Sequence, residues 1–505
     1  MRVRSDRMMI SIRKGNLTTE KADVIILNTF AGAKELGGAT AAVDTALGGM
    51  INRILQEEKF GGKLGEVKLI RTEGRLSSKR ILVVGLGEQK AFNEESVRCA
   101  SAAALDAAKA IGAKKIATVF HGTGNGNMNA KVAAKAIVEG ARLADYSFGR
   151  YRKESQAKSP SELVIVTTDG KIIRAGQDGI RLGEICVQGT ISARELVNTP
   201  GQHMSPHDLV EAARSLTKGK SGVRMKVYDK ERLVRMKAGG LLGIAQGSDH
   251  PPYLVHLTYT PKKKTRKSVA LVGKAVTFDS GGLSLKPAEA MATMKLDMAG
   301  AAAVIGVFAI IDQIAPNATV HGIFGAVENM PSGKAIRPGD VVEVMNGKTI
   351  EILNTDAEGR VTLADTLTYA TKQKPDAIID LATLTGACMV ALGEEITGIM
   401  GNDRALIGAV EDAAQTAGEK VWELPLEPAY KPLIKSDVAD YKNIAGKYGG
   451  AVTAGLLLEE FVAGIPWVHM DIAGPSFAER PMNAYTKKGA TGHGVRTLIE
   501  FLRNL

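Results

Sequence analysis

Short apolar runs alternate with longer stretches in which apolar residues recur every three or four positions through residues 1–170. Short runs are typical of buried strands, and the longer pattern is typical of helices. The pattern predicts strands at ADVIILNTF, RILVVGLGE, KKIATVF and SELVIVTTD, with helices between them at AAVDTALGGMINRILQ, SVRCASAAALDAAKAI and AKVAAKAIVEGARLADYSF. This alternation predicts a compact α/β domain.

The same alternation returns beyond a helix that the pattern places from about Gly176 to Glu195. Strands are predicted at KSVALVGKAVTF, ATVHGIFGAV, DAIIDLATL and WVHMDIA, with helices at 298–315 and after residue 359. We therefore expect an α/β protein of two domains, with a smaller α/β domain at 1–170, a linker helix at 171–197 and a larger C-terminal domain at 198–505. The larger domain should have a mostly parallel central sheet flanked by helices.

Composition narrows the class of protein. The 505 residues are 45% hydrophobic and 24% charged, as in ordinary globular enzymes. The longest apolar run, Met298 to Ile311, is too short to cross a bilayer, so no membrane association is expected. The N-terminus lacks the apolar core of a signal peptide, and the three widely spaced cysteines, Cys99, Cys186 and Cys388, fit a reducing compartment. A cytoplasmic location is predicted.

The net charge of +11 is unevenly distributed. Residues 1–180 hold 29 lysines and arginines against 19 aspartates and glutamates, which accounts for +10 of the total. A basic N-terminal domain can bind nucleic acid, although a solvated basic surface is the commoner cause. The basic cluster PKKKTRK at 261–267 reads as an exposed turn between strands.

Acidic residues follow several apolar runs of the C-terminal half. Asp279 ends VGKAVTFD, Asp297 lies in MKLDMAG, and Asp356 and Glu358 lie in NTDAEGR. Because chemistry in an α/β sheet gathers at the carboxyl ends of the strands, these carboxylates are expected to converge. Converging carboxylates repel one another unless cations neutralise them, and two divalent ions sharing bridging carboxylates are the usual solution.

Lys274 lies inside the apolar run that ends at Asp279. Burial and nearby cations both favour a neutral amine, which could serve as a metal ligand. Residues five apart face opposite sides of a regular strand, so the chain must bend before Asp279 if both side chains are to reach one site. The alternative is a lysine that extends to the surface.

Each acidic residue also has a purely structural interpretation. Thr355 and Glu358 have the spacing of a helix capping box. Asp297 could cap a helix that begins at Met298, and Asp279 could start the turn that follows it. Taken singly, these interpretations compete with the functional one.

Competing chemistries lack their motifs. The chain contains no His-Glu-x-x-His and no Gly-x-Ser-x-Gly, and its two Gly-Lys-Ser/Thr fragments have Arg214 and Val342 where a P-loop needs glycine. A phosphoryl-transfer enzyme would also gather carboxylates around metals, but it should carry a glycine-rich phosphate loop.

The segment NTDAEGR at 354–360 matches the signature of the leucyl aminopeptidases, also called cytosol aminopeptidases, with Val361 where leucine is usual. VGKAVTFDSGGLSLKP and MKLDMAGAAAV resemble that family's other metal-site blocks, with Ala275 where glycine is usual. KSDVADYKNIAGKYGGAVTAG, WVHMDIAGP and KGATGHGVRTLIEFL extend the resemblance over residues 190–505. Residues 1–170 resemble the family only in length and α/β pattern.

The resemblance implies the roles of individual residues. One tightly held metal would be bound by Asp279, Asp356 and Glu358, and a more exchangeable one by Lys274, Asp279, Asp297 and Glu358. Catalytic roles would fall to Lys286 and to Arg360, which would hold a bicarbonate acting as general base. The substrate-binding positions implied are Met294, Asn354, Thr383, Gly386 and Ala473.

The activity implied is that of a dimetal aminopeptidase, a metallo-exopeptidase that releases N-terminal leucine and other apolar residues from peptides by attack of a metal-bridging hydroxide. Manganese or zinc suits the ligands best, and cobalt or magnesium is possible. The family resemblance also implies a homo-hexamer. A nucleic-acid-binding protein with a secondary peptidase activity is the alternative, and weak non-specific DNA binding would follow from the basic N-terminal domain.

Overall fold

The computed structural model describes residues 8–124, 126–153 and 159–505. The chain forms two compact units. Unit 1 comprises Met1–Val187 and Arg480–Lys487, and unit 2 comprises Gln188–Glu479 and Lys488–Leu505. The predicted two-domain α/β fold is confirmed. The division between the units falls inside helix α5 (Ile173–Asn198), and the boundaries expected at residues 170 and 197 stay a prediction.

Unit 1 is built on a six-stranded sheet of order β1-β6-β5-β2-β4-β3, parallel except for β3. Its strands are β1 Met9–Lys14, β2 Val24–Thr29, β3 Val67–Arg71, β4 Arg80–Gly85, β5 Lys115–Thr118 and β6 Glu162–Thr167. Its helices are α1 Gly38–Ala46, α2 Met50–Glu57, α3 Glu94–Ala110, α4 Ala130–Asp145 and the first part of α5, with 3-10 turns η1 Gln89–Ala91 and η2 Gly170–Ile172.

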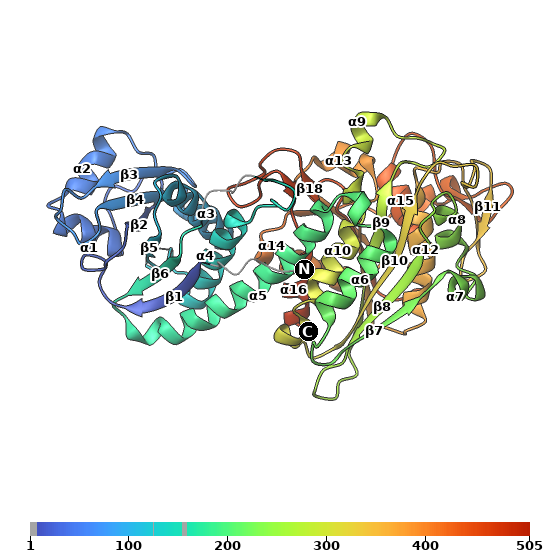
Figure 1. Ribbon diagram of the computed structural model, residues 1–505, viewed down its shortest axis with the longest axis horizontal. Coiled ribbons are helices and arrows are strands. Elements are labelled where there is room, and N and C mark those ends of the chain that lie inside the picture. Colours follow the sequence, from blue (N-terminus) through green and yellow to red (C-terminus); the bar gives the residue numbers. More distant parts are fainter. Residues whose placement is uncertain (1–7, 125, 154–158) are drawn as a thin grey trace. The chain divides into compact units, whose positions relative to one another are not determined.

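Side chains alternate across the sheet of unit 1. Ile25 and Leu27 of β2 pack in a core with residues of α1 and α2, whereas α3 and α4 pack against each other elsewhere in the unit (Figure 1). The single helix predicted at AAVDTALGGMINRILQ is interrupted, because Gly48 and Gly49 adopt left-handed backbone angles that end α1 before α2 begins.

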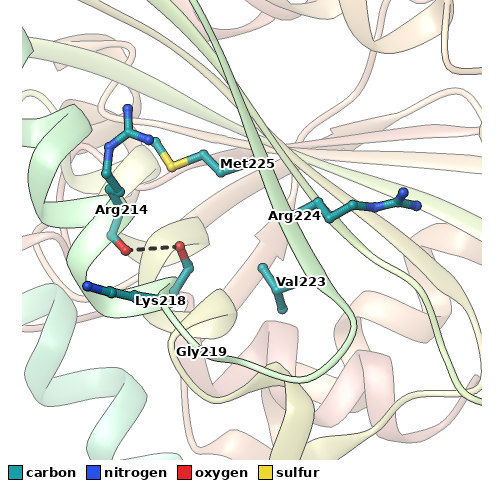
Figure 2. A pocket seen from close by; sticks show the side chains of 7 residues that line it. Arg214, Lys218, Gly219, Val223, Arg224 and Met225 are labelled. Carbon is teal, nitrogen blue, oxygen red and sulfur yellow. Dashed lines mark hydrogen bonds between the residues drawn. The ribbon is translucent and has the colours of Figure 1, made fainter.

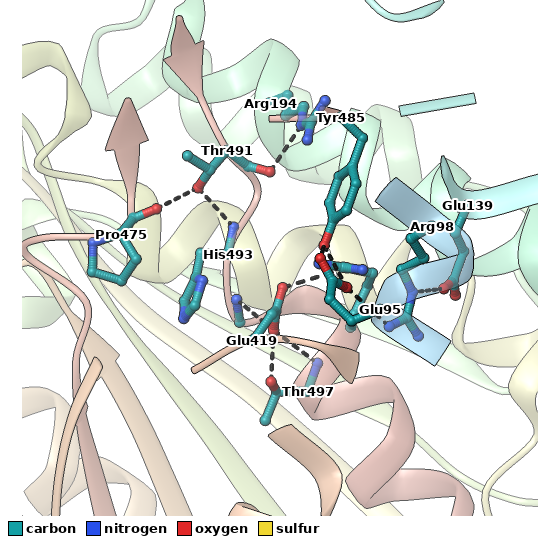
Figure 3. A network of polar contacts seen from close by, with 12 residues as sticks. Glu95, Arg98, Glu139, Arg194, Glu419, Pro475, Tyr485, Thr491, His493 and Thr497 are labelled. Carbon is teal, nitrogen blue, oxygen red and sulfur yellow. Dashed lines mark hydrogen bonds and ion pairs between the residues drawn. The ribbon is translucent and has the colours of Figure 1, made fainter. Parts of the chain in front are cut away.

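A segment late in the sequence completes unit 1. The hydroxyl of Tyr485 donates to both carboxylate oxygens of Glu95, at 2.8 and 2.9 Å. Arg98 donates to Glu95 at 3.2 Å and to the buried Glu139 at 2.6 Å (Figure 3). Residues 480–487 are therefore tied to helices α3 and α4 through a buried arginine.

Unit 2 is built on an eight-stranded sheet of order β15-β14-β17-β13-β9-β10-β8-β7, in which β17, β13, β9 and β10 run parallel through the centre. The strands are β7 Val223–Tyr228, β8 Tyr253–Tyr259, β9 Ser268–Asp279, β10 Thr319–Asn329, β13 Ala377–Ala382, β14 Thr397–Gly401, β15 Val421–Glu423 and β17 Trp467–Asp471. Smaller sheets contain β11 Val341–Glu343, β12 Thr349–Glu351 and β16 Tyr441–Lys442, and β18 Phe477–Ala478 with β19 Gly489–Ala490.

Helices of unit 2 follow the strands. They are α6 Pro206–Thr217, α7 Lys230–Arg235, α8 Gly239–Ala245, α9 Ala288–Met291, α10 Ala299–Phe308, α11 Ile311–Ile314, α12 Glu358–Thr371, α13 Gly386–Leu392, α14 Arg404–Ala417, α15 Gly450–Glu459 and α16 Val495–Arg503, with 3-10 turns η3 Gly201–His203, η4 Met294–Leu296 and η5 Pro428–Ile434. The helix predicted at 298–315 is thus divided into α10 and α11. Across the described parts of the chain, no helix is both long and apolar enough to span a bilayer.

Small residues let α10 lie close to the sheet. A Cβ atom on Gly300 would lie 2.0 Å from the carbonyl oxygen of Leu381 in β13, and one on Gly273 of β9 would lie 2.5 Å from the amide nitrogen of Ala301. The carboxyl ends of β9, β10, β13 and β17 meet at one edge of the sheet because these strands are parallel. This edge carries the acidic residues that the sequence singled out.

Candidate metal centre

Strand β9 brings Lys274 and Asp279 to one site through an irregularity near its end. The pairing with β10 changes from Val276 opposite Val327 to Asp279 opposite Asn329, so β9 holds one extra residue there. A bulge of this kind reverses the alternation of side chains beyond it. The bend predicted between Lys274 and Asp279 is present.

Lys274 is buried between carboxylates. Its ammonium group lies 2.7 Å from Asp297 Oδ1 and 2.7 Å from Glu358 Oε1, and it donates to the carbonyl of Thr383 at 2.9 Å. Burial alone would lower the pKa of Lys274, but the carboxylates of Asp297, Glu358 and Asp279 outweigh burial and raise it. The alternative of a lysine that extends to the surface is wrong.

The NTDAEGR segment forms a turn that leads into α12. Ala357 precedes the helix, and no side chain caps it. Thr355 Oγ1 instead donates to the carbonyl of Gly281 at 2.6 Å and accepts the Ser284 amide at 2.8 Å. The capping-box interpretation is therefore wrong, because Thr355 joins the turn to the loop after β9. Asp356 lies in this turn, and Glu358 is the first residue of α12.

The two remaining structural interpretations concern Asp297 and Asp279, and they have different outcomes. No side chain caps α10, so Asp297 is not a helix cap. It instead bonds Lys274 and accepts from Thr383 Oγ1 at 2.7 Å. Asp279 Oδ1 does accept the Gly281 amide at 2.9 Å, so this residue both starts a turn and faces the other carboxylates.

Lys286 connects the loop after β9 to the NTDAEGR turn. Its ammonium group lies 2.8 Å from Asp279 Oδ2 and 2.5 Å from Asp356 Oδ1. Burial would lower the pKa of Lys286, and the carboxylates, Asp279 foremost, raise it instead. Lys286 is consequently charged in this setting.

The donor set fits divalent cations. Asp279, Asp356 and Glu358 each offer a carboxylate oxygen, and these atoms lie within 4.8 Å of one another. Burial raises the pKa of Asp279, Asp297 and Asp356, and the charge of Glu358 raises the first two further. Oδ2 of Asp297 is buried and accepts no hydrogen bond from a described residue. Four carboxylates and two ammonium groups leave an excess of negative charge, which a bound dication would neutralise.

Arg360 is the third residue of α12, in the first turn of the helix. Its guanidinium is buried, donates through Nη1 to the carbonyl of Asn443 at 2.7 Å, and has no hydrogen-bond partner at Nε among the described residues. Burial lowers the pKa of Arg360 to about 10, with the charges of Glu358 and Asp471 acting in the opposite direction. A buried cation with an unused donor is suited to an anion.

The five substrate-binding candidates differ in how closely the structure joins them to the carboxylates. Thr383 bonds Asp297 directly, and Asn354 Oδ1 accepts the Asp356 amide at 2.8 Å. Met294 begins the 3-10 turn that leads to Asp297, Gly386 begins α13, and Ala473 follows β17. The carbonyl of Met294 accepts the Asp297 amide at 3.4 Å, whereas Gly386 and Ala473 are placed only by the elements that carry them.

The sequence reasoning missed three buried polar residues beside the site. Asp471 Oδ1 accepts the amides of Leu384 and Ala473, each at 3.2 Å, and so joins the ends of β13 and β17. Asn443 bonds the backbone of the NTDAEGR turn, and Asn329 ends β10 beside Asp279. Asp471 and Asn329 end apolar strands, which is the signal that identified Asp279; Asn443 had none.

A surface pocket of about 340 Å³ lies elsewhere in unit 2, lined by Arg214, Thr217, Lys218, Gly219, Val223, Arg224 and Met225. The charged ends of Arg214, Lys218 and Arg224 point in different directions rather than converging (Figure 2). The pocket therefore lacks the geometry of an anion site, and it shares no residue with the carboxylate group.

Fold and site together define an α/β protein in which carboxylates at the edge of a parallel sheet are set up for divalent cations. The chain belongs to the cytosol aminopeptidase family. The model of the family's catalytic domain matches residues 191–499, and that of its N-terminal domain matches residues 26–155. The second match extends the relationship into a region where the sequence alone indicated only a similar length and pattern.

Individual relatives agree over the full length. A "Probable cytosol aminopeptidase" of Alkaliphilus oremlandii (strain OhILAs) is 42% identical over 500 residues, covering 99% of this chain and 100% of that protein. A structure of a tomato leucine aminopeptidase mutant is 36% identical with a TM-score of 0.89, covering 100% of this chain and 98% of that one. The bottromycin maturation enzyme BotP in complex with Mn is 35% identical with a TM-score of 0.84, covering 96% and 99%.

These comparisons confirm the family, the enzyme class and the fold predicted from the sequence. The chain is an aminopeptidase of a metal-dependent family, and hence a hydrolase acting on peptides. They give no support to the alternative of a nucleic-acid-binding protein with secondary peptidase activity. The individual residue roles stay predictions.

Proposed function

We propose that this aminopeptidase releases leucine and other apolar residues from the N-termini of peptides, using two divalent cations. The observation that carries the proposal is the group formed by the buried Asp279 and Glu358 with the partly exposed Asp356, with the ammonium of Lys286 bonded to two of the three. Those three carboxylates would hold the tighter cation. The exchangeable cation would take Lys274 and Asp297, sharing Asp279 and Glu358.

Manganese or zinc suits oxygen ligands with one amine, and cobalt or magnesium would also fit. Such cations supply Lewis acidity, which lowers the pKa of a water molecule and polarises the scissile carbonyl. Lys274 must give up a proton to become a ligand. The surrounding carboxylates oppose that loss, and added positive charge favours it.

Two charged side chains would act on the substrate. The Lys286 ammonium lies between the two loops that carry Asp279 and Asp356, where it could donate to the oxyanion that develops on the scissile carbonyl. Arg360 would bind bicarbonate through its unused guanidinium donor, and that anion would accept the proton of the attacking water. Attack adds the water oxygen to the carbonyl carbon, and the C–N bond then breaks as the leaving nitrogen takes up a proton, which releases the amino acid and the shortened peptide.

Restriction to the first residue would follow from capture of the free α-amine near the exchangeable cation. We expect hydrolysis of leucyl peptides to stop on chelation and on N-terminal acetylation, and to return with Mn²⁺. The rate should rise from neutral to mildly alkaline pH, because the substrate amine and the attacking water both lose protons. Equal turnover of acetylated and free peptides would contradict the proposal.

We also propose a hexameric assembly in the cytoplasm, as the resemblance implies; light scattering of the purified protein tests the assembly. Weak DNA binding remains a prediction. Several cations of unit 1 are paired with its own acids, such as Lys109 with Asp145 at 2.7 Å and Arg142 with Glu184 at 2.6 Å, which reduces any basic patch. If the protein does not shift the mobility of duplex DNA even at low salt, the basic charge of residues 1–180 serves solubility rather than DNA binding.

A further inference from the structure

Asn329 ends strand β10 and is buried beside the carboxylate group. Its side-chain amide nitrogen donates to Asp279 Oδ1 at 2.8 Å and to the carbonyl of Thr355 at 2.9 Å. A primary amide has two N–H bonds, so each serves one partner. Thr355 immediately precedes Asp356, and Asn329 therefore connects the end of β9, which carries Asp279, to the turn that carries Asp356.

The backbone of Asn329 strengthens this connection. Its carbonyl accepts both the amide of Ser280, at 3.0 Å, and the hydroxyl of Ser280, at 2.7 Å. The pairing irregularity of β9 and β10 ends at the Asp279–Asn329 pair. Asn329 is thus fixed to the loop after β9 through its main chain before its side chain reaches Thr355.

These bonds determine which oxygen of Asp279 is available. Oδ1 accepts from Asn329 and from the Gly281 amide, at 2.8 and 2.9 Å, whereas Oδ2 faces Lys286 at 2.8 Å. The carboxylate is consequently held with Oδ2 towards Lys286, whose ammonium group also bonds Asp356. The Asn329 amide holds the Asp279 carboxylate in place without adding a negative charge. An aspartate at this position would add one.

We propose that Asn329 is a positioning residue of the metal centre, which sets the orientation of Asp279 and its spacing from Asp356. This inference rests on the proposed function. Partners outside the ligand shell typically affect metal affinity or activity by about 10- to 100-fold when they are removed. Loss of Asn329 should therefore weaken binding at the tighter site while leaving all of its ligands in place.

The test is a calorimetric Mn²⁺ titration of the chelator-treated full chain. Asn329→Leu keeps a side chain of similar size without donors, and Asn329→Ser is a smaller replacement less prone to misfolding. The matched control is Asn402→Leu, because Asn402 also joins two backbone segments, donating to Ile465 at 3.0 Å and accepting from Trp467 at 2.7 Å, outside the carboxylate group. Thermal unfolding of the chelator-treated proteins accompanies the titration.

Both Asn329 variants should raise the Mn²⁺ dissociation constant of the tighter site by about 10- to 100-fold. Asn402→Leu should leave that constant unchanged, even if it lowers the melting temperature as much as the Asn329 variants do. Wild-type affinity in a folded Asn329 variant would overturn the inference, as would an equal loss in Asn402→Leu. Wild-type protein that binds no Mn²⁺ would instead refute the proposed function.

Discussion

Lys274 and Lys286 are the same residue type at one site, yet their partners differ. Lys274 bonds Asp297 and Glu358, and Lys286 bonds Asp279 and Asp356. Lys274 is also the more deeply buried of the two. A deeply buried amine that exchanges its proton for a cation is suited to ligation, whereas a charged one nearer the surface is suited to stabilising an oxyanion.

We therefore predict opposite outcomes for the two alanine variants. Lys274→Ala should lower occupancy of the exchangeable cation. Lys286→Ala should retain both cations and lower kcat by about 100- to 1,000-fold, as for loss of an oxyanion donor. Elemental analysis combined with peptide hydrolysis measures both. Loss of metal from Lys286→Ala alone would mean that the roles are reversed.

Lys274, Asp279 and Asp297 were predictable because they lie within or at the ends of apolar runs, whereas the expected roles of Lys286 and Arg360 came from the family resemblance. The uncharged residues were harder to predict. Asn329 ends an apolar strand as Asp279 does, but its amide alone does not indicate a metal site, and Asn443 follows no such strand. Thr355 was misread because its spacing to Glu358 is that of a capping box, and only the tertiary contact with Gly281 shows its actual bond.

At the scale of elements, α12 lies so close to β9 that Gly359 leaves little room for a Cβ atom beside Lys274. A Cβ atom on Gly359 would lie 2.6 Å from Lys274 Cε and 2.8 Å from its Nζ. The end of a lysine is flexible, so Gly359→Ala should displace Lys274 rather than disrupt the fold. Alanine also favours a helix over glycine by about 1 kcal/mol.

We accordingly expect Gly359→Ala to retain or increase the free energy of unfolding in urea while weakening Mn²⁺ binding at the exchangeable site. Gly408→Ala in α14 is the matched control, because that helical glycine has open space around its Cβ position. A variant that binds metal normally, or one that is strongly destabilised, would contradict the expected displacement of Lys274.

Strand β8 contacts α12 through His256, whose Nδ1 lies 3.1 Å from the hydroxyl of Tyr369. Burial foremost, together with the charges of His321 and Lys226, lowers the pKa of His256 to about 4. The unfolded chain, with a histidine pKa near 6.5, takes up a proton first as pH falls. The contribution of His256 to the free energy of unfolding should therefore be fully present above pH 6.5. It should decline as pH falls towards 4, by at most about 1.4 kcal/mol per pH unit.

Urea titrations at several pH values check this, with His256→Gln as the comparison. Glutamine cannot titrate, so the variant should show a shallower loss of stability between pH 6.5 and 4. Parallel curves for the two proteins would assign acid sensitivity to other groups.

Elements with long, uniform patterns were predicted best. The central strands β9, β10, β13 and β17 are buried and read as continuous apolar runs. Strands β1 and β3 lie at the edges of their sheet, where charged residues alternate with apolar ones and weaken the signal.

At the scale of the whole molecule, the chain passes between the two units three times, at residues 187–188, 479–480 and 487–488. No pattern in the sequence indicates that residues 480–487 join unit 1. Their place there depends on tertiary bonds such as Tyr485 to Glu95, which hydrophobic periodicity does not encode.

The bonds of Tyr485 can be tested separately from the metal centre. Tyr485→Phe keeps the buried ring and removes the hydroxyl proton that the two carboxylate oxygens of Glu95 share, which should lower the stability of unit 1 by about 1.5–3 kcal/mol. Both tryptophans, Trp422 and Trp467, belong to unit 2, so their fluorescence reports that unit, whereas far-ultraviolet circular dichroism reports both. In urea, the dichroism of the variant should begin to fall at lower concentration while the fluorescence midpoint stays in place. Metal content and turnover should match wild type. A fluorescence midpoint that moves equally would instead show that the three chain passages make the units unfold together.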